Sequence, residues 1–128
     1  MGRAILEHVN VTVSNPEATA KLLCDMFGWR IRWQGESALG GRSLHVGEDD
    51  SYVALYSPEK TLAQNGSTYI RRGGLNHIGV VVDDLDETEH RVLAAGFETH
   101  NHGDYEPGRR FYFNDRDDIE FEVVSYSA

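Results

Sequence analysis

Residues 6–14 read LEHVNVTVS, and polar and apolar side chains alternate along this stretch. Alternation with a period of two is typical of a β-strand with one buried face. The valines at positions 9, 11 and 13 would face the core, and His8, Asn10 and Thr12 would face the other way. Taken alone, a histidine on that second face is an ordinary solvated residue.

The opening stretch occurs a second time in the chain. Residues 75–83 read LNHIGVVVD, which puts His77 in the place of His8 at an offset of 69 residues. Each copy is followed by an Asn or Asp suited to cap a helix, and then by an apolar helical stripe. The expected stripes are Leu22, Leu23 and Met26 in the first copy, and Val92, Leu93 and Ala95 in the second. Each helix is expected to end at a glycine, Gly28 or Gly96.

Three extended segments follow each predicted helix. The first half offers IRWQG, GRSLHVG and SYVALYS, and the second offers FETHN, RRFYFND and IEFEVVS, with GDYEPG and DRDD as turns. Each half is therefore predicted to be a βαβββ module, which gives an α+β fold. We expect one domain over residues 1–128, in which a linker at 58–74 joins a first module at 1–57 to a second at 75–128.

Composition and charge exclude several classes of partner. The 128 residues carry a formal net charge of −9, which disfavours nucleic acid and anionic membranes. No apolar run approaches the roughly 20 residues that span a bilayer. The single Cys24 cannot form an internal disulfide, and the N-terminus lacks the layout of a signal peptide, so we expect a cytoplasmic protein.

The last predicted strand carries a carboxylate on the face that His8 and His77 share. Apolar residues 119, 121 and 123 would face the helix, which leaves Glu122 on the opposite side. The position equivalent to Glu122 in the first module, at an offset of 68, is Ala54. Three of four repeat-related positions thus hold residue types that bind divalent transition metals, and the fourth holds an alanine.

The stretches HVNVTV, HIGVVVDDLD and FYFNDRDDIEFEVV resemble the vicinal oxygen chelate superfamily, over nearly the whole chain. That superfamily includes glyoxalase I, extradiol dioxygenases, methylmalonyl-CoA epimerase, and fosfomycin and bleomycin resistance proteins. The resemblance implies two βαβββ modules forming a curved mixed sheet around a metal and substrate cavity, with the helices outside. It also implies His8, His77 and Glu122 as metal ligands. The family's usual DPDG turn before the glutamate reads DRDD here, at an unchanged distance from Glu122.

The resemblance further implies a divalent metal ion, to which a substrate with two adjacent oxygens binds. Two histidines and one carboxylate are the set associated with non-heme iron oxygen chemistry, so Fe(II) is favoured, with zinc, nickel and manganese as alternatives. Glyoxalase I typically has a glutamate at the fourth position, where Ala54 cannot coordinate. Extradiol dioxygenases and fosfomycin-modifying enzymes use three ligands.

Several other residues are candidates for the site. Extradiol enzymes carry a substrate-binding tyrosine near Tyr112 and an acid–base histidine, for which His100 and His102 are candidates. The alternative for both histidines is a solvated loop. The candidates for substrate binding are Asn10, Thr12, Tyr52, Tyr56 and Arg110.

Three functional hypotheses remain open from the sequence. The first is a metal-dependent enzyme, narrowed to an extradiol-type ring-cleaving dioxygenase, and the second is a lyase or isomerase of glyoxalase or epimerase type. The third is a non-enzymatic small-molecule binding protein, which retention of the three ligand residues disfavours. Short chains of this superfamily commonly dimerise, so we expect a homodimer with a small-molecule substrate. In that dimer one subunit would supply His8, and the other His77 and Glu122.

Overall fold

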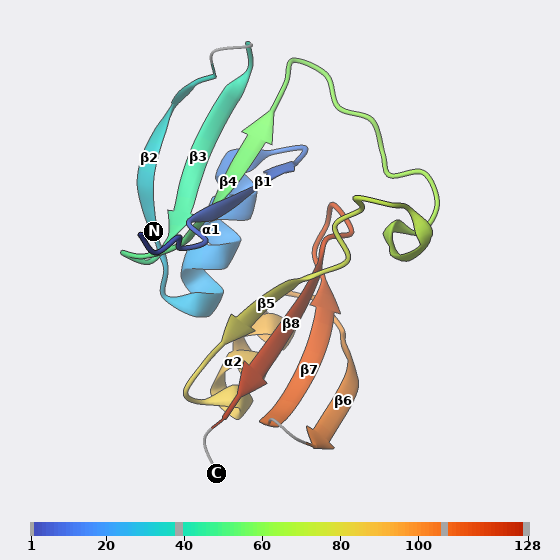
Figure 1. Cartoon of the computed structure of the whole chain (residues 1–128). Helices are drawn as coiled ribbons and strands as arrows, with labels where there is room; N and C mark the ends of the chain where they lie inside the picture. The colour runs from blue at the N-terminus through green and yellow to red at the C-terminus, as the bar shows by residue number, and fades with distance from the viewer. Residues whose placement is uncertain (1, 38–39, 106–107, 127–128) are drawn as a thin grey trace. The chain divides into compact units, whose positions relative to one another are not determined.

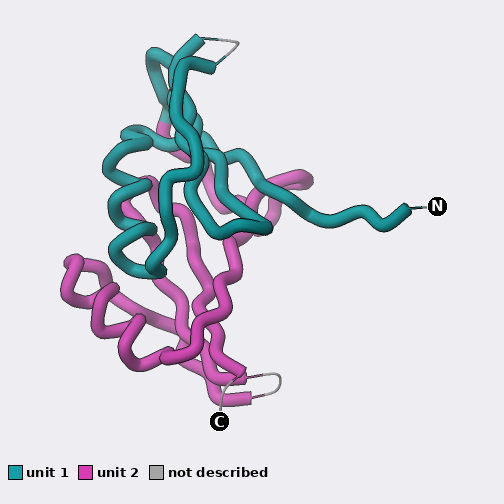
Figure 2. The backbone as a smooth tube through the Cα atoms, turned by 90° about the vertical axis from the view of Figure 1, so that its left-hand side faces the viewer, with its two compact units in different colours: residues 1–62 teal, residues 63–128 magenta. Residues whose placement is uncertain are grey.

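The structure is a computed structural model that describes residues 2–37, 40–105 and 108–126. It consists of two compact units, Met1–Leu62 and Ala63–Ala128 (Figures 1 and 2). Each unit contains a four-stranded sheet with one α-helix packed on one face. No helix in these described ranges is both long enough and apolar enough to cross a membrane.

The two units have the same topology. The first contains β1 (His8–Thr12), α1 (Pro16–Phe27), β2 (Arg30–Glu36), β3 (Arg42–Gly47) and β4 (Tyr52–Ser57), with strand order β1-β4-β3-β2. The second contains η1 (Thr68–Ile70), β5 (Ile78–Val81), α2 (Leu85–Ala94), β6 (Thr99–Tyr105), β7 (Gly108–Asn114) and β8 (Glu120–Ser125), with order β5-β8-β7-β6. The first strand of each unit pairs in parallel with the last, and the other pairs are antiparallel. The predicted α+β fold of two βαβββ modules is confirmed, as two separate sheets rather than one.

The helices begin where the sequence predicts. The side chains of Asn15 and Asp84 accept hydrogen bonds from backbone N–H groups three residues on, at 3.1 and 3.0 Å. Gly28 ends α1 with a φ of 71°, a left-handed conformation that glycine adopts without steric cost. In α2 the cap is Ala95, and Gly96 follows it with a φ of 96°.

Each core lies between the helix and one face of its sheet. In the first unit Leu23 and Met26 of α1 are buried with Leu44, Val46 and Leu55. In the second, three phenylalanines of β7 and β8 form the centre, with Phe113 and Phe121 stacked at 5.1 Å. The expected stripe of α2 is partly wrong, because Leu93 is 52% exposed and Ala95 is exposed. The helix instead buries Leu85, Thr88 and Val92, spaced by three and four residues.

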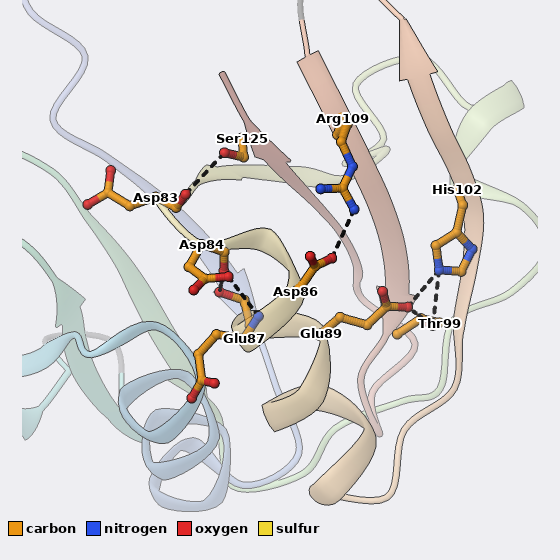
Figure 3. Close-up of polar contacts among 10 residues, drawn as sticks. Asp83, Asp84, Asp86, Glu87, Glu89, Thr99, His102, Arg109 and Ser125 are labelled. Carbon is orange, nitrogen blue, oxygen red and sulfur yellow. Dashed lines mark hydrogen bonds and ion pairs between the residues drawn. The ribbon is translucent and has the colours of Figure 1, made fainter. Parts of the chain in front are cut away.

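Strand β6 contains an irregularity that the sequence did not indicate. The stretch GDYEPG was predicted as a turn, but β6 continues through Gly103 to Tyr105; residues 106–107 lie outside the described ranges. Its pairing with β7 shifts between His100 and Gly103, where Asn101 has a φ of 51°. This β-bulge breaks the alternation of side chains. His100 therefore stacks on Tyr112, whereas His102 turns to the helix side and contacts Glu89 of α2 (Figure 3).

Thr99 and His102 of β6 both contact Glu89 of α2. Glu89 Oε2 accepts a hydrogen bond from Thr99 and lies 2.6 Å from His102 Nε2. Burial alone would raise the pKa of Glu89, but these hydrogen bonds outweigh it and hold the pKa below its ordinary 4.5. Because the folded pKa is lowered, the stabilisation is present above pH 4.5 and is lost as the pH falls through the folded pKa.

Thr99→Val is therefore expected to lower the free energy of unfolding by about 1 kcal/mol at pH 7, through loss of one hydrogen bond to a carboxylate. As the pH falls through the folded pKa, which lies below 4.5, the cost should become smaller, since the carboxyl group becomes neutral. Urea unfolding of wild type and variant at pH 7 and pH 3 measures both. An equal cost at the two pH values would show that the charge of Glu89 plays no part.

The DRDD turn keeps the geometry needed before Glu122. Asp115 is buried, and its carboxylate accepts hydrogen bonds from the backbone N–H groups of Asp117 and Ile119 at 2.9 and 3.0 Å. Asp118 has a φ of 63°, the left-handed conformation for which glycine is favoured and which aspartate tolerates. The turn thus closes without Pro or Gly, and β8 begins two residues later.

Candidate metal centre

The face of each sheet that turns away from its helix, here called the polar face, carries the predicted ligands. On the second unit the strand register aligns His100 with Tyr112, Tyr112 with Glu122, and Glu122 with Gly79. These residues form a row across the sheet. His77 directly precedes β5, and its side chain reaches the same row through its contact with Glu122. Glu122, predicted from alternation, and the candidates Tyr112 and His100, implied by the family resemblance, are therefore neighbours in space.

His77 and Glu122 are in direct contact. The Nε2 atom of His77 lies 3.0 Å from Glu122 Oε1, and both side chains are largely buried, at 32% and 14% exposed. Two donor atoms, each about 2.1 Å from one ion and about 90° apart, are themselves about 3 Å apart. The pair therefore fits two adjacent ligands of a divalent metal. Without an ion the same distance makes a hydrogen bond.

Arg110 holds the other oxygen of Glu122. Its guanidinium donates to Glu122 Oε2 at 2.6 Å and to the carbonyl of Gly108 at 3.1 Å, and it lies over the ring of Tyr105. Arg110 was predicted as a substrate-binding residue. In the structure its guanidinium group forms an ion pair with the carboxylate of Glu122. Glu122 is left with one oxygen, Oε1, for a metal ion.

Tyr112 and His100 lie beside this pair. The rings of His77 and Tyr112 meet edge to face at 5.8 Å, and those of Tyr112 and His100 stack at 6.2 Å. Burial and then the negative charge of Glu122 raise the pKa of Tyr112, so its hydroxyl stays protonated. His100 Nε2 lies 2.8 Å from Asn114 Oδ1, which fixes the ring.

A cavity of about 240 Å³ opens at the next position along the same strands. Its lining is polar and includes Glu120 and Asn114, which pair across β7 and β8. The other lining residues come from the segment before β5 and from the DRDD turn: Gln64, Gly66, Ser67, Thr68, Tyr69, Asn76 and Asp118. Gln64 and residues 66–69 of the segment predicted as a linker thus line a cavity of the second unit.

The polar face of the first unit carries His8 in a row of neighbouring aromatic rings. Tyr52 stacks on His8 at 4.8 Å and on His45 at 4.6 Å, and Trp33 follows His45 at 4.9 Å. His8 Nδ1 lies 2.8 Å from Glu7 Oε1. This contact leaves Nε2 of His8 as the nitrogen for a metal.

The strand register confirms that Ala54 takes the place of Glu122. Asn10 pairs with Ala54 across β1 and β4, as Gly79 pairs with Glu122 across β5 and β8. Ala54 is only 2% exposed, and on β3 its neighbour is His45. The first unit therefore offers His8 without a carboxylate at the equivalent position.

The remaining predicted residues separate into two groups. Asn10, Thr12, Tyr52 and Tyr56 lie on the first unit's polar face, where Tyr56 donates to the carbonyl of Gly40 at 3.2 Å. His102 lies on the helix side of β6, apart from Tyr112 and Glu122. The structure thus brings His100 to the row and leaves His102 out of it.

His8 belongs to the first unit, and His77 and Glu122 belong to the second. Within residues 2–37, 40–105 and 108–126, no three His, Cys, Asp or Glu side chains gather closely enough to hold a metal ion. The three-residue metal site therefore stays a prediction.

Four residues around the predicted site were missed from the sequence, and so was the pairing of Arg110. His45 was recognisable, because it alternates with buried Leu44 and Val46 along β3. Glu7 contacts its own neighbour in the chain, His8. Tyr69, Glu120 and the pairing of Arg110 carry no sequence signal, because their contacts depend on side chains from other strands or segments.

Each unit is a βαβββ module with a histidine at the start of its first strand, as His8 is in β1, or directly before it, as His77 is before β5. The chain belongs to the Glyoxalase/Bleomycin resistance protein/Dioxygenase superfamily, whose family model matches residues 5–123. No curated protein sequence matches it.

Solved structures with the same fold include a glyoxylase/bleomycin resistance protein/dioxygenase domain from Frankia sp. EAN1pec, at a TM-score of 0.80 and 20% identity, covering 97% of this chain and 98% of that one. The fosfomycin resistance protein FosX from Mesorhizobium loti is 26% identical, with a TM-score of 0.72 and coverage of 99% and 94%. FosX from Listeria monocytogenes, in a complex with Mn(II) and sulfate, is 18% identical, with a TM-score of 0.71 and coverage of 97% and 93%.

Proposed function

We propose that the protein is a metal-dependent enzyme whose small substrate binds a divalent ion through two adjacent oxygens. His8, His77 and Glu122 hold the ion. The observation that carries the proposal is the 3.0 Å separation of His77 Nε2 from Glu122 Oε1, with Arg110 on the other carboxylate oxygen. The Mn(II) complex of the Listeria FosX supports a metal at this fold.

The narrower proposal is ring cleavage of a catechol-like substrate of extradiol type. An Fe(II) ion at these ligands would supply a place where the substrate oxygens and O2 meet. Tyr112, held protonated, donates a hydrogen bond to a substrate oxygen. His100, fixed through Nε2 by Asn114, keeps Nδ1 to take a proton from the substrate and return it. The row of His100, Tyr112 and Glu122 supports this assignment.

A second candidate is chemistry of the fosfomycin-modifying type, which the 26% identity to the Mesorhizobium FosX favours. A phosphonate needs a cationic site. Arg110 and Arg109 are each paired with a carboxylate, Glu122 and Asp86. Because the charge of each arginine is already balanced by a carboxylate, the two residues make a poor site for a phosphonate. The ring-cleavage proposal is therefore favoured. Ala54 disfavours glyoxalase-type isomerisation, which relies on a carboxylate at that position.

Protein purified without chelators and reconstituted with Fe(II) under anaerobic conditions is expected to consume O2 with catechols. His100→Ala should lower kcat by about 10²-fold, since it removes the acid–base group. His90→Ala, on the exposed side of α2, is the matched control. Loss of fosfomycin without O2 uptake would favour the second candidate, and inertness toward both would contradict an enzymatic role of these types.

The same proposal includes a homodimer whose metal sites are shared between subunits. Sedimentation is expected to show a dimer, and mixing the His8→Ala and His77→Ala proteins should restore part of the metal binding that each lacks. A monomer that still holds one metal ion per chain would overturn the shared site.

A further inference from the structure

Each predicted metal-binding histidine has a carboxylate beside its Nδ1 atom. In the second unit, Nδ1 of His77 faces Glu120 Oε1 at 3.9 Å. This Nδ1 is buried and has no hydrogen-bond partner among the described residues. Glu120 is itself held, because the hydroxyl of Tyr69 donates to Oε1, and this bond raises the pKa of Tyr69 to about 12.

The first unit also has a carboxylate and a tyrosine at Nδ1 of its histidine, namely Glu7 and Tyr52. Nδ1 of His8 lies 2.8 Å from Glu7 Oε1, and the hydroxyl of Tyr52 approaches the same oxygen at 3.4 Å. Tyr52 pairs with His8 across β1 and β4. At the offset of 68 that relates Ala54 to Glu122, Tyr52 corresponds to Glu120. The carboxylate and the tyrosine therefore come from different positions in the two modules, yet they meet at the equivalent nitrogen.

The chemistry of histidine ligation explains why this nitrogen matters. A neutral imidazole that binds a metal through Nε2 must carry its proton on Nδ1. A buried N–H needs an acceptor, and a carboxylate in that place fixes the tautomer and the ring and makes Nε2 a stronger ligand. Glu120 has a carboxylate oxygen 3.9 Å from Nδ1 of His77.

We propose that Glu120 and Glu7 are positioning residues that accept the Nδ1 protons of His77 and His8, with Tyr69 and Tyr52 orienting the two carboxylates. The inference rests on the proposed metal site. It assigns a role to the segment that joins the modules, because Tyr69 lies in η1.

The metal affinity of the full chain tests the proposal. Zn(II) binding is measured by competition with a chromophoric chelator. Glu120→Ala and Glu7→Ala are each expected to weaken binding by about 10- to 100-fold. Glu87→Ala and Glu17→Ala, which remove surface ion pairs with Arg91 and Arg42, are the matched controls and should leave affinity unchanged. Tyr69→Phe should weaken binding in the same direction as Glu120→Ala.

Proton NMR of the zinc-loaded protein supplies a readout that a purely structural role would not change. In wild type the Nδ1–H protons of His77 and His8 should resonate downfield and exchange slowly. Glu120→Ala should speed exchange at His77 alone, and Glu7→Ala at His8 alone. Unchanged affinity and exchange in folded variants would overturn the proposal.

The experiment distinguishes failure of the proposed metal site from failure of the proposed roles of Glu120 and Glu7. If wild type binds no Zn(II), the proposed function fails, and the Nδ1–H of His8 in the metal-free protein still tests the role of Glu7. Loss of that proton signal in Glu7→Ala supports the contact, and its persistence contradicts it.

Discussion

His77→Ala is expected to lower the affinity of the protein for a divalent metal by about 10²- to 10³-fold. A structural zinc site releases about 10–16 kcal/mol through four ligands, so each ligand contributes roughly 3 kcal/mol. Without His77, Glu122 keeps its bond to Arg110 but has no imidazole beside Oε1. His8→Ala and Glu122→Gln should act similarly, and the Gln variant keeps an oxygen for Arg110.

Elemental analysis and chelator competition measure this effect, with His90→Ala as the control for losing an imidazole elsewhere. Thermal unfolding gives a second measure, since a ligand at a hundredfold excess over its Kd stabilises a protein by about 2.7 kcal/mol. That stabilisation should vanish in the three variants. Stoichiometric metal in all three variants would show that these three residues are not metal ligands.

Phe121→Ala is expected to lower the free energy of unfolding by about 3–5 kcal/mol. Phe121 is 1% exposed and stacks on Phe113, so its removal leaves a cavity in the core of the second unit. The residue lies in β8 between Glu120 and Glu122, which face the other side. Metal affinity should therefore fall together with stability, because the strand that carries both carboxylates loses its packing against the core.

Phe121→Leu is the matched control, because it keeps more of the buried volume than alanine does and should therefore cost less than the alanine variant. Urea unfolding measures both variants. A loss below about 1 kcal/mol in the alanine variant would mean that the core closes over the missing ring.

The sequence predicted the two modules because the signals for them are local. Alternation along residues 6–14 and 75–83, capping by Asn15 and Asp84, and Gly28 at the end of α1 each depend on neighbours in the chain. The sequence also predicted the equivalence of Ala54 and Glu122, which the strand register bears out.

The sequence could not separate His100 from His102 as candidates, and it placed part of the apolar stripe of α2 wrongly. The bulge at Asn101 sends His102 to the helix, although spacing alone puts it on the face of His100. In α2, Leu93 fits an apolar stripe by residue type but lies on the exposed side.

What the sequence by itself determined is the duplicated fold and the face on which His8, His77 and Glu122 lie, because a strand period of two fixes a side chain's face. What only the tertiary structure decided is what each of these groups touches. Arg110 on Glu122, Glu120 beside His77 and Tyr69 on Glu120 are contacts between separate segments. Such contacts depend on strand register and on the packing of residues 63–77, which no local pattern encodes.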